Sequence, residues 1–225
     1  MAPKKNLCQV GVAFYTVPDY PTQWTFVVSN NRRFEGQVWC TTLMENTDGR
    51  GAISMDLDWS PACLDQRMIF SGVVAVVESP HPFDTLKDSI PMGDLVSRVN
   101  PSFPFVTWAD IGRDSETYVG LILTHLCRAR LISVPGMDLN NPTNLIRPLL
   151  GVVQKTKVPQ MGNYPIVSLT GEVIFGDTRM FCAGTFLPSS SLGYDSYLQF
   201  REIDLCTPVS RLFISTTRNV KRLTD

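Results

Sequence analysis

The sequence predicts an α+β protein in which an antiparallel, β-rich domain packs on one buried central helix, with a β-rich C-terminal extension. Residues 1–80 are the first observation, because they contain strand-length runs rich in Val, Ile, Phe, Tyr, Trp and Thr between polar breaks. Residues 115–132 are the second, because their apolar residues recur with helical spacing. The third is a return to strand-like runs after residue 166. We therefore place the first domain at 1–135 and the extension at 136–225, packed on the same domain.

Five strands are predicted in the N-terminal part of the chain. The polar segments NNRRFEG (30–36) and NTDGRG (46–51) have the composition of hairpin loops. The run VVAVV (73–77) is apolar without interruption, which is typical of a central strand buried on both faces. The predicted strands are QVGVAFYTV (9–17), QWTFVVSN (23–30), GQVWCTTLM (36–44), AISMDLDW (52–59) and MIFSGVVAVVE (68–78).

One long helix is predicted over 115–132. Its apolar residues cover most of the circumference, which indicates a helix packed on several sides. Asp114 is the expected N-cap, and Ser115 then lies in the first turn. The segment VPG (134–136) is expected to end the element.

The segments around this helix are predicted to be short or irregular. DTLKDSI (84–90) fits one or two helical turns, and a loop is expected over 100–112. Residues 137–165 are also expected to be rich in loops. Two further strands are predicted, at 166–175 and at 180–186.

The composition is that of an ordinary globular protein. Of the 225 residues, 44% are hydrophobic and 18% are charged, which is enough for a core. The formal net charge of −1 gives no electrostatic reason to expect nucleic acid as a partner. No apolar run reaches the roughly 18 residues that a membrane span needs. The N-terminal residues are predicted to form a first strand and not a secretory signal.

The six cysteines are widely spaced and contain no C-x-x-C pair. The two histidines cannot complete a typical zinc site with them at short spacing, so no metal is expected. Reduced, mostly buried thiols indicate a cytoplasmic protein. Because the chain has no G-x-x-x-x-G-K-[ST], G-x-G-x-x-G, H-E-x-x-H or G-x-S-x-G motif, we expect no cofactor.

Four segments carry a resemblance to a known family. They are TQWTFVV (22–28), EGQVWCTTL (35–43), RMIFSGVVAVVES (67–79) and SETYVGLILTHLCRARLI (115–132). In order and spacing they resemble a poorly characterised fungal family of papain-like proteins, related in layout to permuted cysteine peptidases, over residues 7–132. The resemblance implies a papain-like fold with a cleft at the mouth of the helix.

The residues that this family uses for chemistry are replaced in this chain. Where the family has the His of a His-Trp pair, this chain has Gln23, followed by Trp24. Where the family has the Cys that opens the helix, this chain has Ser115, and the Trp three positions later is Tyr118. The resemblance therefore implies a pseudo-peptidase that has lost both members of a Cys–His pair.

Ser115 could act as a nucleophile only with a base within hydrogen-bond reach, because helix placement alone does not ionise a serine. His125 is ten residues further along the same helix, roughly 15 Å away at about 1.5 Å per residue. His81 could approach only if its loop folds back. Three interpretations of Ser115 stay open: a helix cap, a ligand contact, and a nucleophile paired with His81.

Gln23 does not titrate, so it could orient a carbonyl or close an oxyanion hole but could not shuttle a proton. A plain polar strand position is the alternative. Carboxylates at the helix mouth could have raised pKa values and act as acids, or could only cap and solvate the helix start. The candidate catalytic residues are Ser115, Glu116, Gln23, Asp110 and Tyr118, and the candidate substrate-binding residues are Trp24, Trp108, Phe105, Arg113 and His81.

The favoured function is binding of a small, partly apolar organic molecule in the former active-site cleft. Such a cleft could support cofactor-independent chemistry of fungal biosynthesis, such as a cyclisation or an isomerisation, because positioning and one acid group can suffice. Two alternatives stay open. One is a non-catalytic protein-interaction module, which could form a homodimer, and the other is a hydrolase that uses Ser115 with His81.

Overall fold

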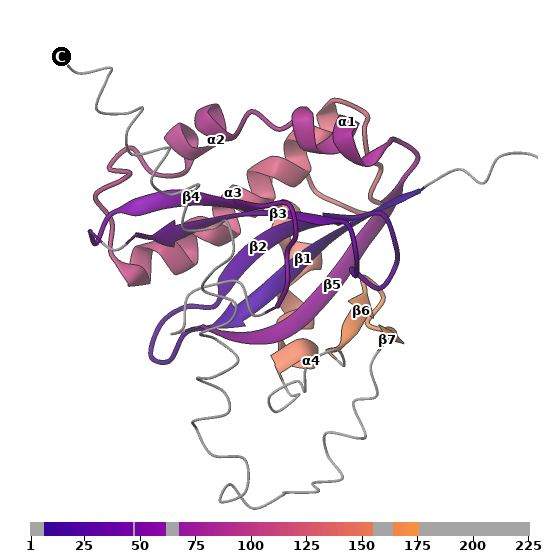
Figure 1. Cartoon of the computed structure of the whole chain (residues 1–225), viewed down its shortest axis with the longest axis horizontal. Coiled ribbons are helices and arrows are strands. Elements are labelled where there is room, and N and C mark those ends of the chain that lie inside the picture. The colour runs from indigo at the N-terminus through magenta and orange to yellow at the C-terminus, as the bar shows by residue number, and fades with distance from the viewer. Residues whose placement is uncertain (1–6, 47, 62–67, 155–163, 176–225) are drawn as a thin grey trace, which may run out of the picture. The chain divides into compact units, whose positions relative to one another are not determined.

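The computed structural model describes residues 7–46, 48–61, 68–154 and 164–175. Seven strands form one sheet in the order β4-β3-β2-β1-β5-β6-β7 (Figure 1). Neighbouring strands run antiparallel except β5 and β6, which run parallel. The chain is therefore an α+β protein whose sheet is dominated by antiparallel pairing. The strands are β1 (Cys8–Thr16), β2 (Gln23–Ser29), β3 (Val38–Glu45), β4 (Gly51–Asp56), β5 (Ile69–Ser79), β6 (Ile166–Ser168) and β7 (Val173–Phe175).

The first five strands confirm the strands predicted in the N-terminal part of the chain. β1 to β4 are sequential neighbours, and β5 returns to pair with the other side of β1. β5 therefore has a strand on each side, and its Val73 and Val74 are buried in different apolar clusters. This is the central position that its uninterrupted apolar run predicted.

Successive side chains along each strand point to opposite faces of the sheet, and each face has its own apolar cluster. One face packs against the helices and includes Val12, Trp24 and Val74; we call it the helix face. The opposite face includes Ala13 and Val73 and forms a separate cluster; we call it the second face. The helices are α1 (Phe83–Asp88), α2 (Met92–Val99), α3 (Trp108–Arg128), the 3-10 turns η1 (Pro142–Leu145) and η2 (Arg147–Leu149), and α4 (Leu150–Gln154).

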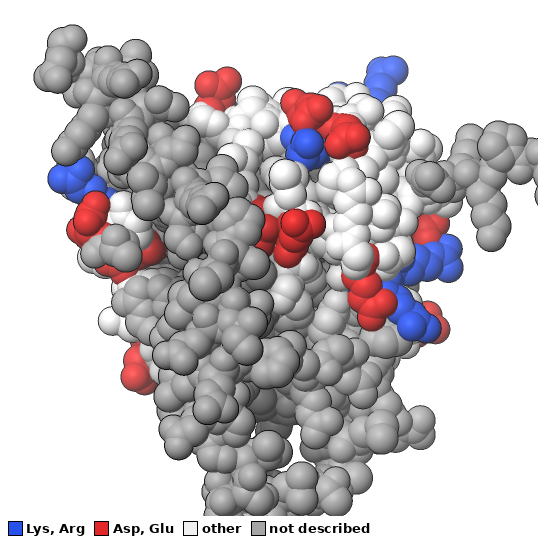
Figure 2. All heavy atoms as spheres, viewed as in Figure 1, with Lys and Arg blue, Asp and Glu red and all other residues white. Residues whose placement is uncertain are grey.

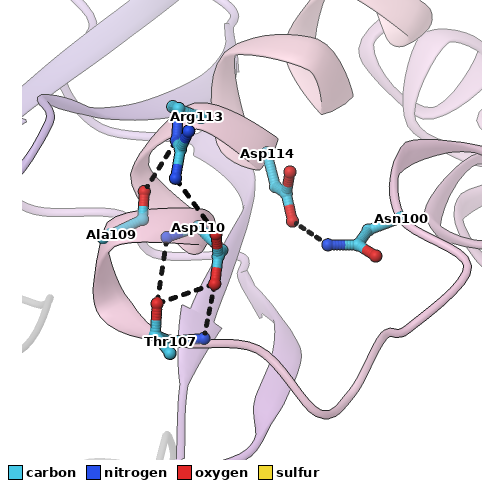
Figure 3. A network of polar contacts seen from close by, with 6 residues as sticks. All are labelled: Asn100, Thr107, Ala109, Asp110, Arg113 and Asp114. Carbon is cyan, nitrogen blue, oxygen red and sulfur yellow. Dashed lines mark hydrogen bonds and ion pairs between the residues drawn. The ribbon is translucent and has the colours of Figure 1, made fainter.

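The long helix α3 starts earlier than the sequence predicted, at Trp108. Its N-cap is Thr107, whose side chain accepts a hydrogen bond from the Asp110 backbone while the Asp110 carboxylate accepts one from the Thr107 backbone (Figure 3). The predicted N-cap, Asp114, lies in the second turn and accepts a hydrogen bond from Asn100 Nδ2 at 2.9 Å. The prediction was wrong because the T-x-x-D capping pattern lies inside the segment expected to be a loop.

α3 also ends before the VPG segment that was expected to end it. The C-cap is Ala129, and Arg130 adopts the left-handed conformation with φ of 59°. The N–H of Arg130 donates to the Cys127 carbonyl at 3.0 Å, and the N–H of Leu131 donates to the Leu126 carbonyl at 2.9 Å. This is a Schellman motif, so backbone hydrogen bonds close the helix without a glycine at the left-handed position.

The short helices confirm the predicted secondary structure only in part. α1 confirms the helical turns predicted over 84–90, whereas residues 137–165, expected to be loop-rich, contain η1, η2 and α4. Pro142 is the first residue of η1 and Pro148 is the second residue of η2, and at these positions a proline needs no backbone N–H. The prolines that suggested a loop therefore mark where these turns begin.

The predicted strand at 166–175 is a hairpin of the two short strands β6 and β7, which turns at Gly171 with φ of 82°. Because β6 pairs with β5, this part of the predicted extension belongs to the same sheet as the first domain. The strand predicted at 180–186 lies outside the described residues, as does the whole of the extension after residue 175. Contacts divide the chain into units 1–182 and 183–225, and the second unit also lies outside the described residues.

The described surface mixes charged and apolar side chains. Acidic and basic residues are interspersed over the face that Figure 2 shows. Phe105 is 70% exposed, more than any other large hydrophobic side chain in the described ranges. None of the helices in those ranges is long and apolar enough to cross a membrane.

Candidate functional site

The backbone pairing between β2 and β3 ends before the start of β2, where α3 packs against these strands. The paired residues run from Ser29 with Val38 to Phe26 with Thr41. Side chains supply the next hydrogen bonds of Trp24, because its N–H donates to Ser115 Oγ at 3.0 Å and its carbonyl accepts from Thr42 Oγ1 at 2.8 Å. We call this opened end of the ladder, formed by Gln23, Trp24, Thr42, Leu43 and Ser115, the β2–β3 junction.

Gln23 completes the β2–β3 junction from the strand side. Its Nε2 donates to Thr42 Oγ1 at 2.7 Å and to the Leu43 carbonyl. These two bonds fix the orientation of the amide, since only the nitrogen can donate to a carbonyl. Its Oε1 is buried and has no hydrogen-bond partner within the described part of the chain. The junction therefore presents one oriented acceptor.

Ser115 has a structural role in the β2–β3 junction. It is fully buried, and besides accepting from Trp24 its Oγ donates to the Gly112 carbonyl at 2.8 Å. A Cβ at Gly112 would lie 2.7 Å from the carbonyl oxygen of Pro21, so only glycine lets α3 approach the start of β2 this closely. The close approach brings Ser115 within reach of the strand. Ser115 therefore lies in the second turn of α3, as a ladder contact and not as a cap.

The structure does not bring either histidine to Ser115. His125 Nε2 lies 2.9 Å from the Ser89 carbonyl, beyond α1. His81 lies just after β5, where its N–H donates to Ser79 Oγ, which in turn donates to the Leu131 carbonyl. Leu131 follows the C-terminal end of α3, roughly 20 Å along the helix from Ser115. A Ser115–His81 pair is therefore not formed in this structure.

The four aromatic candidate site residues do not share one surface. Trp24 and Tyr118 are buried in the helix-face cluster. The Tyr118 hydroxyl lies 3.0 Å from Thr41 Oγ1, and burial raises the pKa of Tyr118 to about 12. Trp108 belongs to the second-face cluster. Phe105 is exposed, with the Arg50 guanidinium 5.2 Å above its ring.

The polar residues near the start of α3 pair with one another (Figure 3). The hydrogen bond from the Thr107 hydroxyl holds the pKa of Asp110 below its usual range, with smaller help from Arg113 at 3.1 Å. Asp110 therefore does not have the raised pKa expected of a catalytic acid at this mouth. Glu116 accepts two hydrogen bonds from Arg147, at 3.0 and 2.6 Å, which tie α3 to η2.

Two residues of this region were missed in the sequence. Thr42 bridges Gln23 and Trp24, and Thr25 shares a strand face with Gln23. Thr25 Oγ1 is buried without a hydrogen-bond partner in the described ranges, as Gln23 Oε1 is. The sequence signal that could have identified Thr25 is that it and Gln23 are polar residues two positions apart in the largely apolar strand β2.

The chain matches no protein-family model, no curated protein and no solved structure. Within the described ranges, no three His, Cys, Asp or Glu side chains are grouped so that they could hold a metal ion.

Proposed function

We propose that the chain is a non-peptidase protein on a papain-like frame that binds a small, partly apolar organic molecule beside Gln23. The observation that carries this proposal is the Oε1 of Gln23, which has no hydrogen-bond partner among the described residues although the amide is fully buried and its Nε2 is paired. A buried acceptor without a partner costs about 1–3 kcal/mol of stability, which a donor from a ligand would remove. Such an oriented, unmatched group is a common feature of binding sites.

The same arrangement supports binding, or positioning without a covalent step, over hydrolysis. Ser115 Oγ both donates and accepts within the protein, and the described histidines lie elsewhere. Gln23 can orient a substrate but cannot transfer a proton. If the protein is an enzyme, a cofactor-independent isomerisation or cyclisation of a bound substrate fits these groups best. The cytoplasmic location predicted from the cysteine pattern is part of this proposal.

Native mass spectrometry of the full chain tests this function. We expect a complex in which one small molecule is bound per chain, with the extra mass lost on denaturation and recovered in an organic extract. The bare chain mass, found after expression in several unrelated hosts, would count against the proposal. A fluorophosphonate probe that labels Ser115 stoichiometrically would instead support the hydrolase alternative.

An interaction module is the second candidate, and the exposed Phe105 ring beneath Arg50 favours it. Exposed aromatic and arginine side chains are enriched at protein interfaces. The variant Phe105→Ser distinguishes the two functions. It should leave a small-molecule complex intact, whereas an interaction module should lose self-association or partner binding.

A further inference from the structure

Gln23 and Thr25 place two polar side chains on the second face of the sheet. They lie two residues apart on β2, which brings their side chains to one face about 7 Å apart. Gln23 pairs with Tyr15 of β1, and Thr25 pairs with Ala13 of β1. Tyr15 and Ala13 both belong to the second-face cluster. Gln23 and Thr25 are both fully buried.

Both side chains carry an oxygen without a hydrogen-bond partner in the described part of the chain, Oε1 of Gln23 and Oγ1 of Thr25. Natural proteins seldom leave buried polar groups unmatched, and neighbouring exceptions indicate a missing partner. A valine would fill the volume of Thr25 without the unmatched hydroxyl. Threonine at this position therefore lowers stability unless its hydroxyl binds something.

The second face next to these oxygens is aromatic. The rings of Tyr15 and Phe70 lie 5.2 Å apart, and those of Phe70 and Tyr164 lie 5.1 Å apart. Trp59 donates its ring N–H to the Tyr15 hydroxyl at 2.9 Å. An apolar, aromatic surface with a few directed polar groups is the usual composition of a site for a small organic molecule.

We propose that the second face of the sheet binds a planar, largely apolar molecule that donates an N–H or O–H to Gln23 Oε1 and makes a second hydrogen bond to Thr25 Oγ1. The inference rests on the proposed function and adds the position of the site and the donor character of the ligand. It also moves the site from the helix mouth to the opposite face of β2.

Indole and 1-methylindole are matched probes for the donor, because the methyl group removes the only N–H and leaves the ring system unchanged. Binding to the full chain, stripped of any bound molecule by refolding, is measured by ligand-observed NMR titration. We expect indole to bind and 1-methylindole to bind roughly tenfold more weakly. Equal affinities, or no binding of either probe, would overturn the inference.

The variant Thr25→Val tests the second contact without endangering the fold. Because the hydroxyl has no hydrogen-bond partner in the part of the chain that the structure describes, we expect Thr25→Val to unfold at the same or a higher urea concentration than the wild type. We expect the same variant to bind 5-hydroxyindole, which adds a second hydrogen-bonding group to the ring, several-fold more weakly, and to bind indole, which has only its N–H, with unchanged affinity. Thr117→Val, at an exposed position of α3, is the control and should leave the binding of both probes unchanged.

The outcomes separate this inference from the function on which it rests. If native mass spectrometry shows a bound molecule that Thr25→Val and Gln23→Leu both retain, the binding function stands and the second-face site is wrong. If Thr25→Val becomes less stable in the stripped protein, its hydroxyl is paired within the chain and the site is also wrong. If the bound molecule is lost in Thr25→Val while folding is kept, the second-face site is supported.

Discussion

At the scale of single residues, Ser115 has a structural role. Its hydroxyl replaces a strand partner for Trp24 and is buried from solvent. A serine in this position contributes through the hydrogen bond that it satisfies, since an unmatched buried N–H is costly. Two substitutions of Ser115 test this role.

Ser115→Ala removes the acceptor for the Trp24 N–H. We expect a loss of about 1–3 kcal/mol in the free energy of unfolding, measured by urea denaturation. The matched control is Ser97→Ala, because Ser97 is exposed on α2 and donates to the Gly93 carbonyl. The control should change the free energy by less than about 0.5 kcal/mol. Equal effects of the two variants would contradict the structural role of Ser115.

Ser115→Cys tests whether the position opens to solvent as a nucleophile must. Burial raises the pKa of a thiol, so we expect this cysteine to stay unmodified by iodoacetamide in the folded protein. Peptide mapping by mass spectrometry gives the modification at this site alone. Ser97→Cys, on the exposed side of α2, should be alkylated rapidly. Fast alkylation of Ser115→Cys would show an accessible cleft and favour a peptidase-like site.

The sequence predicted that the start of β2 and the helix position Ser115 lie close together, but it did not predict the hydrogen bond between them. We expected position 115 to lie near the strand that starts at Gln23, and the structure places Ser115 Oγ against the Trp24 backbone. The sequence could not show that this contact is buried from solvent. The burial of Ser115 depends on how closely α3 approaches Pro21 at Gly112. This is a tertiary contact, and no local sequence pattern predicts it.

At the scale of elements, the two ends of α3 show which local signals are readable. The capping box at Thr107 and Asp110 has a sequence signature, T-x-x-D, that fixes the true start. The C-terminal Schellman motif has no such signature, because the left-handed position that is usually a glycine is Arg130 in this chain. The periodic apolar stripe between them was sufficient to predict the helix itself.

Thr107→Ala removes the N-cap of α3, and we expect it to cost about 1 kcal/mol of stability at neutral pH. The Thr107 hydrogen bond lowers the pKa of Asp110 in the folded state. A lowered folded-state pKa stabilises the protein above the unfolded pKa and loses this effect as the pH falls through the folded value. The difference between wild type and Thr107→Ala should therefore shrink below about pH 4.

Urea denaturation at pH 7 and at pH 3 measures this change. Thr117→Ala, in an exposed position of the same helix, is the control and should show the same small difference at both pH values. A difference for Thr107→Ala that stays constant with pH would mean that Asp110 and Thr107 are not coupled.

Arg130→Gly should stabilise the protein by about 1 kcal/mol, because a non-glycine residue pays that much to hold the left-handed conformation. The paired variant is Arg128→Gly, the last residue of α3, where glycine should instead destabilise by about 1 kcal/mol. Both variants remove one positive charge from the end of the same helix. Thermal denaturation should therefore shift in opposite directions, and shifts of the same sign would refute the Schellman ending.

At the scale of the whole molecule, the sequence predicts the kinds of elements better than their arrangement. The five N-terminal strands follow from composition and hairpin loops. The parallel addition of β6 beside β5 does not, because a strand of three residues, Ile166–Ser168, is too short to carry a period. The apolar run of β5 predicted a central strand, but it did not predict that the neighbours of β5 are β1 and β6.

We propose that Gln23 provides the oriented acceptor of a small-molecule site. Native mass spectrometry of Gln23→Leu against Gln37→Leu, a glutamine exposed between β2 and β3, tests it most directly. We predict that the wild type and Gln37→Leu carry the same bound molecule and that Gln23→Leu, folded by circular dichroism, carries none. A folded Gln23→Leu variant that retains the molecule at full occupancy would show that Gln23 does not hold it.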